Sequence, residues 1–497
     1  MADPRAAQGP TPAALGPRPR LGWPTMVAYG VGAISNSTKT RGLATFLMIF
    51  YNQVMGLPAA WVGLGTALAL VFDALVDPVV GQISDNTRSR LGRRHPYMYA
   101  AAMPVAILFF LIWNPPTGLE PLALFGYMMA CLLSIRLFDT FFELPSSALI
   151  PELVEDYDKR TVLISIRVLC SVVGGLLMMV FAYQVALREL PGGGGGVLAK
   201  DGYFSYAMAG ATVIFTTILI SSAATHRFIP WLRQPPVERR SRREHLGDIL
   251  ATLRNRAFFT IVGSGSLVFL VSGITSGLTL YISLFFWEFT QAQLILIVTF
   301  NAGAGLIGAS LASPVSRAIG KKEAALVGYI LGAVAELTPY FLRLLGVMPE
   351  NGDPRVFYIV ATGAFITMTS WAMTGVFLTA LIADVVEDNA VKIGRRTEGL
   401  LFAADSLFKK IGSSGGPAVA GLILTAAAFP IGAKPGEVDP QILRDLMLFY
   451  IPTLIAIYTV SISLMAAYNI DRKKHADNVR ILLETEAANP ATEGRPT

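Results

Sequence analysis

The sequence predicts an all-α protein with about twelve membrane-spanning helices, and three observations support this fold class. The chain has 497 residues, of which 53% are hydrophobic and only 15% charged, whereas a soluble domain carries about 25% charged residues. Its mean hydropathy is +0.54. Long apolar runs recur along the whole chain, and each approaches the ~20 residues that a helix needs to cross hydrocarbon. The formal net charge of +6 comes from arginine-rich segments between these runs and does not indicate a nucleic-acid partner.

The chain begins with a segment that we expect to be a disordered cytoplasmic tail. Residues 1–22 are rich in Pro and Ala and contain no apolar core, so they bury too little apolar surface to order themselves. They also lack the layout of a cleavable signal peptide. Twelve apolar runs follow, and a hydropathy window places their starts near Met26, Trp61, Tyr97, Leu122, Thr161, Tyr203, Phe258, Leu294, Glu323, Val356, Thr397 and Leu446.

Positive charge distinguishes the two sides of the membrane. Alternate connections are rich in Arg and Lys, as in residues 88–94 and 239–243, whereas the others carry few basic residues. The positive-inside rule therefore places both termini in the cytoplasm. On this basis we expect a first six-helix membrane domain at 23–230 and a second at 257–470. A cytoplasmic linker at 231–256 joins them, and a second cytoplasmic tail follows at 471–497. The glycine run "PGGGGG" then lies outside as a flexible connection.

A faint internal repeat relates the two halves of the chain. The segment "GQISDNTRSRLGRRHPY" follows the second run, and "SPVSRAIGKKEAA" follows the eighth, about half a chain later. Both join a helix end rich in small residues to a basic turn. Two six-helix halves joined by a charged cytoplasmic linker are the arrangement of the major facilitator fold, in which the halves rock around a site near the midplane. We therefore predict this fold, with 12 transmembrane helices.

Several ionisable residues lie inside apolar runs, where each costs on the order of 3 kcal/mol. Asp73 and Asp77 are four residues apart and so share one helix face. Others in apolar runs are Lys39, Arg41, Arg136, Asp139, Glu143, Arg167, Asp405, Lys409 and Lys410. Such charges either pair with one another and hold helices in register, or face a cavity and bind substrates and ions.

The balance of these charges favours ion binding. Asp73, Asp77 and Glu143 carry three negative charges, against one positive charge from a lysine. A bound monovalent cation or proton would reduce this excess of negative charge. Oxygen ligands suit hard cations. An intramembrane zinc site is not expected, because all histidines lie at span ends or in loops: His95, His226, His245 and His475. The two cysteines, Cys131 and Cys170, lie in apolar runs and are interpreted as packing residues.

Three motifs in order resemble those of the glycoside–pentoside–hexuronide:cation symporters, the family typified by the melibiose permease. The first reads "DALVDP" and then "DNTRSRLG", and the second is "ELP" followed by "LIP" and "DKR". The third is the pattern AD…GxRxEG…K, which here begins at Ala383 and ends at Lys410. The resemblance covers nearly the whole chain. That family also resembles the sodium-dependent lysophospholipid transporters, which keep the aspartates of the second span and lack the residues that hold the sugar.

The resemblance implies roles for residues at matching positions. The family's cation-site carboxylates fall on Asp73, Asp77 and Glu143, its threonine on Thr140 and its site lysine on Lys410. Residues implied or expected to meet the substrate are Ser37, Arg41, Asp139, Glu143, Ser147, Arg167, Trp371, Asp405 and Ser406. Residues expected to control the change of conformation are Arg88, Arg93, Arg94, Asp384, Arg396 and Glu398.

The chain departs from the family at positions that matter for its ligands. Val76 stands where the family has an asparagine that offers a neutral oxygen to the cation. Ser37 replaces a carboxylate that holds galactoside hydroxyls, and Ser147 replaces a tryptophan that stacks on the sugar. Gly375 replaces a second tryptophan, although Trp371 lies one turn away. These departures leave the substrate class open and keep both Na⁺ and H⁺ as coupling ions, with Na⁺ slightly favoured.

We therefore expect a secondary active transporter that couples a cation to a sugar, glycoside or related polar solute by alternating access. The alternative substrate is a lysophospholipid or other amphiphilic anion. An enzyme would need a nucleophile–base pair or metal ligands at membrane depth, which the sequence does not offer, whereas a receptor or scaffold descended from a transporter stays open. We expect no cofactor besides the coupling ion, a small-molecule substrate, no nucleic acid, a monomeric state, and a location in the plasma membrane or, in a bacterium, the inner membrane.

Overall fold

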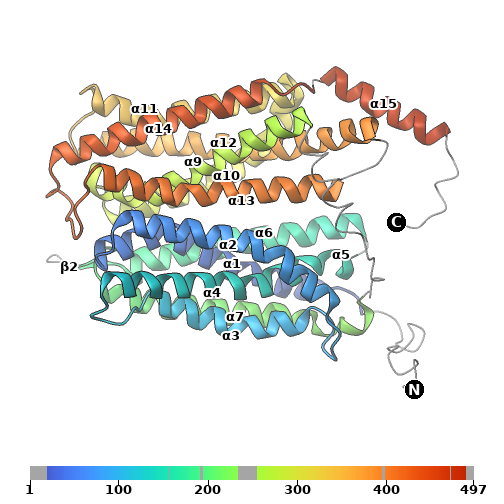
Figure 1. Cartoon of the computed structure of the whole chain (residues 1–497), viewed down its shortest axis with the longest axis horizontal. Helices are drawn as coiled ribbons and strands as arrows, with labels where there is room; N and C mark the ends of the chain where they lie inside the picture. The colour runs from blue at the N-terminus through green and yellow to red at the C-terminus, as the bar shows by residue number, and fades with distance from the viewer. Residues whose placement is uncertain are drawn as a thin grey trace. The chain divides into compact units, whose positions relative to one another are not determined.

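A computed structural model of the chain describes residues 19–154, 156–190, 194–232, 255–393, 398–470 and 472–488 (Figure 1). Among these residues lie twelve helices of 18 or more residues: α1 (Trp23–Ile49), α2 (Ala59–Asn86), α3 (His95–Ile112), α4 (Pro121–Ala148), α6 (Tyr157–Phe181), α7 (Asp201–His226), α9 (Arg256–Tyr281), α10 (Gln291–Ile319), α11 (Lys321–Leu344), α12 (Pro354–Ile393), α13 (Glu398–Ala426) and α14 (Pro440–Ala466). The predicted twelve-helix architecture is confirmed.

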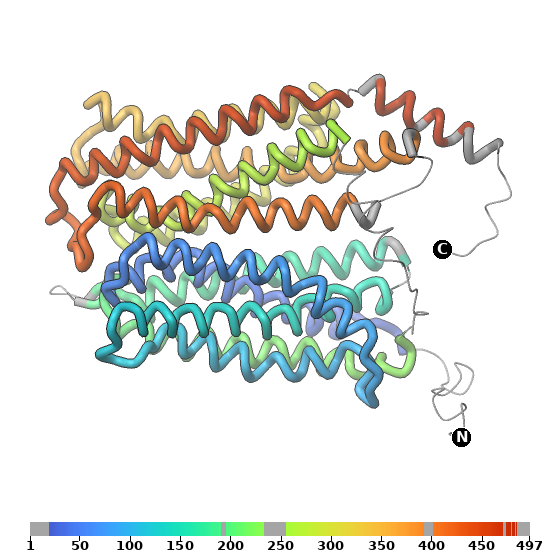
Figure 2. Tube along the Cα trace, viewed as in Figure 1, coloured from blue at the N-terminus to red at the C-terminus, as the bar shows by residue number. Residues whose placement is uncertain are grey.

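Short elements complete the described chain. They are α5 (Ile150–Leu153), α15 (Arg472–Ala488), the π-helical turns η3 (Phe50–Val54), η4 (Ala182–Ala186) and η6 (Ile282–Phe286), and the 3₁₀ turn η5 (Ile229–Trp231). β1 (Glu189–Leu190) pairs antiparallel with β2 (Gly194–Gly195) in the predicted glycine-rich connection, of which part lies outside the described residues. α15 follows α14 as a separate helix (Figure 2).

Ten of the described helices are long and apolar enough to cross a membrane by length and composition. The two long helices outside this set are α1 and α13. α1 carries Lys39 and Arg41 within it, and α13 carries Asp405, Lys409 and Lys410. Both long helices outside the set therefore carry charged residues within their apolar runs, and these include predicted site residues.

The chain divides into two compact units, which are described separately below. The first comprises Met1–Leu57 and Leu68–Glu238, and the second Pro58–Ala67 and Arg239–Thr497. The first turns of α2 are thus grouped with the second unit, whereas the rest of that helix belongs to the first. This division is a matter of packing, and the bounds 23–230 and 257–470 that we expect from the sequence stay a prediction.

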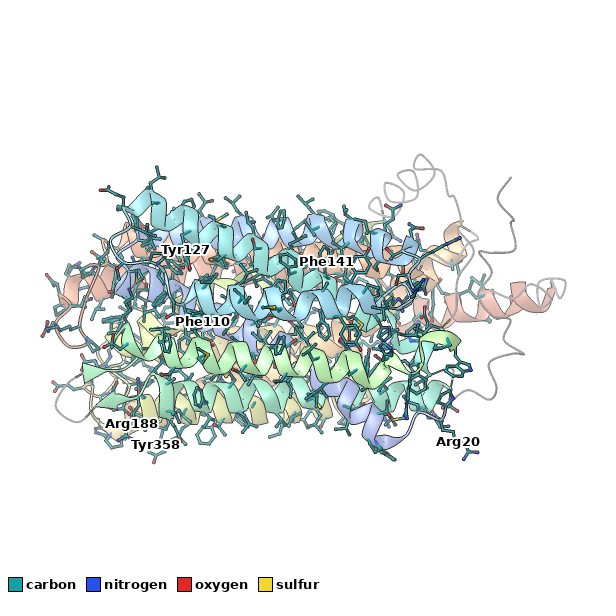
Figure 3. The ribbon with its side chains drawn as sticks, turned by 90° about the horizontal axis from the view of Figure 1, so that it is seen from below. Arg20, Phe110, Tyr127, Phe141, Arg188 and Tyr358 are labelled. Carbon is teal, nitrogen blue, oxygen red and sulfur yellow. The ribbon has the colours of Figure 1, made fainter. Side chains whose placement is uncertain are left out.

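In the first unit, aromatic and hydroxyl contacts hold α3 between α4 and α7. The Tyr127 hydroxyl of α4 donates to the Leu111 carbonyl of α3 at 2.8 Å. Phe110 of α3 packs edge-on against Phe204 of α7, with ring centroids 5.5 Å apart. Figure 3 labels Phe110 and Tyr127 among the side chains of these helices. Because the bilayer supplies no hydrophobic drive between helices, such packing and hydrogen bonds fix their association.

The first helix of each half ends in the same way. α1 continues into η3 and α9 into η6, both π-helical turns. Each turn carries a buried aromatic cluster: Phe50 packs on Trp113 at 5.4 Å between centroids in the first unit, and Phe286 packs on Trp287 at 4.7 Å in the second. This correspondence agrees with the internal repeat predicted from the basic turns.

Small residues let the helices of the second unit approach closely. A Cβ atom added to Gly416 of α13 would overlap the backbone of Gly273 in α9. A Cβ atom on Gly412 would likewise overlap the backbone of Ser266, one or two turns away along the same pair of helices. Glycines at such contacts allow backbone-to-backbone packing that no other residue permits. In contrast, a Cβ atom on Gly303 of α10 would meet no atom within 4 Å.

We predict that Gly416→Ala lowers the thermal unfolding temperature of the purified protein. The added methyl group gains up to about 1 kcal/mol of helix propensity but overpacks the α9–α13 contact at a cost of about 1–3 kcal/mol. Gly303→Ala is the matched control and should leave the unfolding temperature unchanged or raise it. An equal response of the two variants would show that the close approach at Gly416 does not stabilise the fold.

Candidate cation and substrate site

The two aspartates of α2 lie on the polar side of that helix. Leu68, Leu75 and Val79 are 48%, 67% and 56% exposed and follow one another at four- to seven-residue steps along one apolar face. Asp73 and Asp77 are about 160–200° from Leu75 by the 100° turn per residue, and both are partly buried. The helix therefore directs the two carboxylates away from its apolar surface, as their shared spacing predicts.

Thr140 of α4 meets one of these aspartates. Its hydroxyl lies 3.1 Å from Asp77 Oδ1 and 2.9 Å from the Arg136 carbonyl oxygen, so it can donate to either. Thr140 is buried, at 3% exposure. The structure thus brings together two of the residues that the resemblance implies for a cation, in a group of carboxylate, hydroxyl and carbonyl oxygens. Oxygen ligands of this kind suit a hard monovalent cation or a proton.

One turn further along α4, Glu143 forms an ion pair across the helices. Its Oε1 accepts from Arg167 Nη2 of α6 at 3.1 Å and lies 3.4 Å from the Ser147 hydroxyl. Its Oε2 has no hydrogen-bond partner among the described residues. Glu143 was expected both as a cation ligand and as a substrate residue. Its observed partners connect it with Arg167 and Ser147, two of the expected substrate residues.

Arg167 is held in place from its other side. Its Nη1 donates to the Tyr29 hydroxyl at 2.7 Å and to the Ser146 hydroxyl at 3.3 Å. The Tyr29 hydroxyl in turn donates to the Ser146 carbonyl oxygen at 2.5 Å, and the guanidinium lies 5.2 Å from the centre of the Tyr29 ring. These contacts from α1 and α4 fix the guanidinium plane, which is the condition for directional recognition of a ligand's oxygen atoms.

A second buried ion pair joins α1 to α4. Lys39 Nζ contacts Asp139 Oδ1, and Lys39 is only 2% exposed. Removing one member of such a pair would leave an uncompensated charge in a low dielectric. Asp139 was expected as a substrate residue, and the structure places it in this pair with Lys39, which the sequence marked only as an intramembrane charge.

The remaining predicted substrate residues of the first unit lie on α1. Ser37 is buried and donates to the Ile34 carbonyl of its own helix at 3.0 Å. Arg41 is exposed, and its side chain passes beside Gly175 of α6, where an added Cβ atom would lie 2.7 Å from Arg41 Nε. Arg41 therefore offers a cation at the surface of the first unit, four residues from Ser37.

In the second unit, α13 carries the other predicted residues. Asp405 pairs with Lys409 at 2.6 Å, one turn apart. Ser406 is exposed and Lys410 is partly buried. Trp371 of α12 is partly buried against the apolar core of this unit. The proposed roles of Lys410 in the cation site and of Trp371, Asp405 and Ser406 toward the substrate stay predictions.

The basic turn between α2 and α3 is organised around two acids, Glu152 and Asp85. Arg93 and Arg94 both contact Glu152 of α5, Arg94 at 3.0 Å, and both lie within 3.8 Å of Asp85. Burial lowers the pKa of Arg94 from its ordinary value, although Glu152 partly offsets this effect. Arg88, the third predicted residue of this turn, is exposed. Glu152 was not identified from the sequence. The available clue was its position, since it is an acid at the end of the fourth apolar run, on the same side of the membrane as the arginines.

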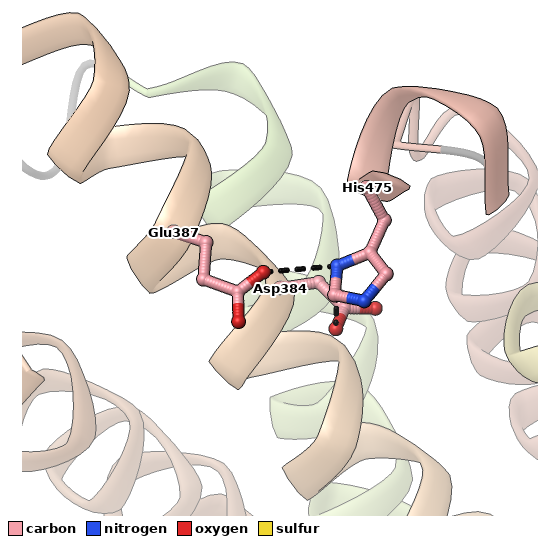
Figure 4. Close-up of side chains that lie close together, drawn as sticks. All are labelled: Asp384, Glu387 and His475. Atoms are coloured by element: carbon pink, nitrogen blue, oxygen red, sulfur yellow. Dashed lines mark ion pairs between the residues drawn. The ribbon is translucent and has the colours of Figure 1, made fainter. Parts of the chain in front are cut away.

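The equivalent turn of the second unit is organised similarly. Lys321, which opens α11, pairs with the buried Asp384 of α12 at 2.6 Å. His475 of α15 lies 2.9 Å from Glu387 and 3.5 Å from Asp384 (Figure 4). These three side chains offer ligand atoms within 4.8 Å of one another, a set that could hold a metal ion, although Asp384 already pairs with Lys321. The predicted Arg396 lies outside the described residues, as does the side chain of Glu398.

Sequence reasoning missed another intramembrane acid, the partly buried Glu336 of α11. Its carboxylate accepts from the Thr275 hydroxyl at 2.9 Å and from the Tyr458 hydroxyl at 2.5 Å. A single acid within the apolar run "GAVAELTPY" was the available signal. Tyr29 and Ser146 were also missed, because neutral side chains that orient a charged group leave no distinctive pattern in the sequence.

Comparison with known proteins places these features in a family. The model of the family "MFS/sugar transport protein" matches residues 28–472. A symporter of Synechocystis sp. is 25% identical, with 95% of this chain and 98% of that protein covered. The isoprimeverose transporter of Lactiplantibacillus pentosus is 23% identical, with 94% of this chain and 93% of that protein covered. The crystal structure of the nucleoside transporter NupG matches in fold with a TM-score of 0.61 and 14% identity, over 90% of this chain and 99% of that one.

The matched segment covers most of the chain, from α1 to the start of α15. Its relatives are membrane transporters, so the expectation that the protein is not an enzyme is confirmed. The chain therefore belongs to the MFS/sugar transport protein family, as a multi-pass membrane protein of the twelve-helix major facilitator fold that serves secondary transport of sugars or similar solutes.

Proposed function

We propose that the protein is a cation-coupled symporter of a glycoside, uronide or related polar solute, working by alternating access. The observation that carries this proposal is the contact between Asp77 and Thr140, at 3.1 Å, on two helices that are long and apolar enough to cross a membrane. The motif resemblance to the glycoside–pentoside–hexuronide:cation symporters supports it, as do relatives that are named symporters and a sugar transporter. We do not propose the amphiphilic-anion alternative, because neither of these relatives favours it.

The proposed coupling ion binds beside α2 and α4. Asp73 and Asp77 supply charge, and Thr140 supplies a neutral hydroxyl oxygen that is already hydrogen-bonded to Asp77. Val76 offers no ligand, so Na⁺ would have one oxygen fewer than the family provides. We favour Na⁺ because the paired carboxylates and Thr140 are present, with H⁺ as the competing ion. The motif resemblance also implies a site lysine, which falls on Lys410 of α13.

The proposed substrate site uses the fixed guanidinium of Arg167. Arg167 pairs with Glu143 and adjoins Ser147, so donors and acceptors for sugar hydroxyls occur side by side. Arg41, exposed on α1, adds a cation that would favour a carboxylate-bearing solute such as a uronide. In the second unit, Trp371 would supply the aromatic face, and Asp405 with Ser406 would supply further acceptors for hydroxyl groups.

We further propose the membrane setting that the positive-inside rule indicates. Both termini and the linker lie in the cytoplasm, and the protein acts as a monomer in the plasma membrane, or in the inner membrane of a bacterium. The ion pairs of Arg93 and Arg94 with Glu152, and of Lys321 with Asp384, would stabilise one conformational state at this cytoplasmic side.

The first prediction concerns coupling. In proteoliposomes screened with radiolabelled pentosides, hexosides and glucuronides under an imposed Na⁺ or pH gradient, the wild type should accumulate at least one of them. Asp73→Asn and Asp77→Asn should each reduce accumulation to passive equilibration, because a neutral amide of the same size weakens the attraction for a cation. Asp201→Asn, at an exposed position in the first turn of α7, is the matched control. Normal accumulation by both site variants would refute the coupling assignment.

The second prediction separates the two ions. If Na⁺ drives uptake, Thr140→Ala should raise the Na⁺ concentration for half-maximal uptake by up to about tenfold, since one hydrogen-bonding oxygen contributes on the order of 1 kcal/mol. Initial uptake rates over a series of Na⁺ concentrations measure this value. Unchanged uptake in sodium-free buffer on a pH gradient would instead identify H⁺, and Glu143→Gln should then be more damaging than Thr140→Ala.

The third prediction concerns the basic turn. Replacing Arg93 and Arg94 by Gln should lower the maximal transport rate about tenfold while changing substrate affinity much less, because a loss of about 1.4 kcal/mol from one state shifts its population about tenfold. Uptake rates over a range of substrate concentrations separate the two parameters. Arg90→Gln, at an exposed position of the same turn, should behave as the wild type. A pure loss of affinity in the double variant would contradict the proposed role.

A further inference from the structure

Glu336 lies well inside a membrane-spanning helix. It belongs to α11, which runs from Lys321 to Leu344 and qualifies as a span by length and composition. At 1.5 Å per residue, the carboxylate position is about 22 Å from the first residue of the helix and about 12 Å from the last. A charge at such depth is costly and marks a functional group by default, provided that its partners are identified.

The partners of Glu336 are hydroxyl groups from two other helices. Tyr458 of α14 donates to Oε2 at 2.5 Å, and Thr275 of α9 donates to Oε1 at 2.9 Å. The Thr275 hydroxyl also lies 3.3 Å from the hydroxyl of Tyr450 in α14. Both oxygens of the carboxyl group are therefore engaged, and the three hydroxyls form one connected network.

No basic side chain neutralises this carboxyl group among the residues that the structure describes. The titratable groups that face it are Tyr340 on its own helix and Tyr450 and Tyr458 on α14. Thr275 of α9 contacts Glu336, and Trp371 of α12 adjoins the Tyr458 hydroxyl. Neither of these two side chains titrates. The other charged side chains that the structure describes on these helices and on α10 form no recorded ion pair or hydrogen bond with Glu336: Arg256, Arg317, Lys321, Lys322, Glu323, Arg343, Arg355, Asp384, Glu387, Asp388, Arg444 and Asp445.

We infer that Glu336 is a proton-binding site of the second unit, separate from the proposed cation site at Asp73, Asp77 and Thr140. A proton from water binds to one carboxyl oxygen and forms a neutral carboxylic acid, and the same proton returns to water on release. A hydroxyl group can donate to a carboxylate or accept from a carboxylic acid. The network of Thr275, Tyr450 and Tyr458 can thus remain hydrogen-bonded in both states by rotating its hydrogens.

The geometry favours a proton over a metal cation. Hard metal cations take about six oxygen ligands, whereas the hydroxyls recorded beside Glu336 are those of Thr275, Tyr458 and Tyr450. A proton needs a single carboxyl oxygen and one acceptor. Through Tyr458, which adjoins Trp371, the protonation state can also affect the predicted aromatic face for the substrate. That consequence rests on the proposed function, whereas proton binding itself does not.

Infrared difference spectroscopy on the purified full-length protein tests this inference without a substrate. Spectra recorded between acidic and alkaline buffer, free of Na⁺, should contain the carbonyl stretch of a carboxylic acid shielded from water. This band should be lost in Glu336→Gln. It should persist in Glu350→Gln, a matched change at an exposed position just beyond α11, and in Asp77→Asn, so that failure of the proposed cation site does not affect the result.

A second variant guards against misfolding of Glu336→Gln. Tyr458→Phe keeps the carboxyl group and removes its shortest hydrogen bond, so it should shift the midpoint of the spectral titration by up to about one pH unit. A shielded carboxyl band that is unchanged in both variants would overturn the inference. A band that responds to added Na⁺ at constant pH, and not to pH itself, would also overturn it, since the bound ion would then be Na⁺.

Discussion

The absence of water in the hydrocarbon layer is the constraint on which the rest of this structure depends. Backbone groups at that depth must be satisfied within helices, and charged side chains must find partners inside the protein. The described helices meet this demand with side-chain pairs such as Lys39–Asp139, Glu143–Arg167 and Asp405–Lys409. These pairs cost desolvation energy and add little net stability. Their retention is better explained by a need to hold, and at times to release, charge at depth.

The two units contain carboxyl groups in different environments. Glu143 faces a guanidinium that Tyr29 and Ser146 orient, so in this structure its charge is compensated by Arg167. Glu336 faces hydroxyl groups only, among its described partners, and under our inference its charge is compensated when a proton binds. Asp77, with Thr140 as a hydroxyl partner, also lies in an oxygen-rich environment. A transporter that couples solute movement to an ion needs both kinds, because one positions the solute and the other changes its charge during the cycle.

The ends of the two units show the internal repeat most clearly. In the first unit Arg93 and Arg94 converge on Glu152, and in the second Lys321 binds Asp384. In each half of the chain, a basic turn follows the second long helix, α2 or α10. This turn binds an acid that belongs to the fourth long helix or directly follows it: Glu152 after α4 and Asp384 in α12. In the second unit α15 adds His475 beside the same acid. The C-terminal helix is therefore attached to the residues that we propose to stabilise one conformational state.

The sequence by itself determined the features that depend on local periodicity and composition. Twelve apolar runs predicted the twelve long helices, since a span needs only enough consecutive apolar residues, and the four-residue spacing of Asp73 and Asp77 predicted their common face. The pairing of charges depended on the tertiary structure. Lys39 and Asp139 are 100 residues apart, and no local pattern indicates which of several acids a buried lysine meets. The same holds for Glu336, whose hydroxyl partners come from α9 and α14, because contacts between helices are fixed by packing of the whole bundle and not by neighbours in the chain.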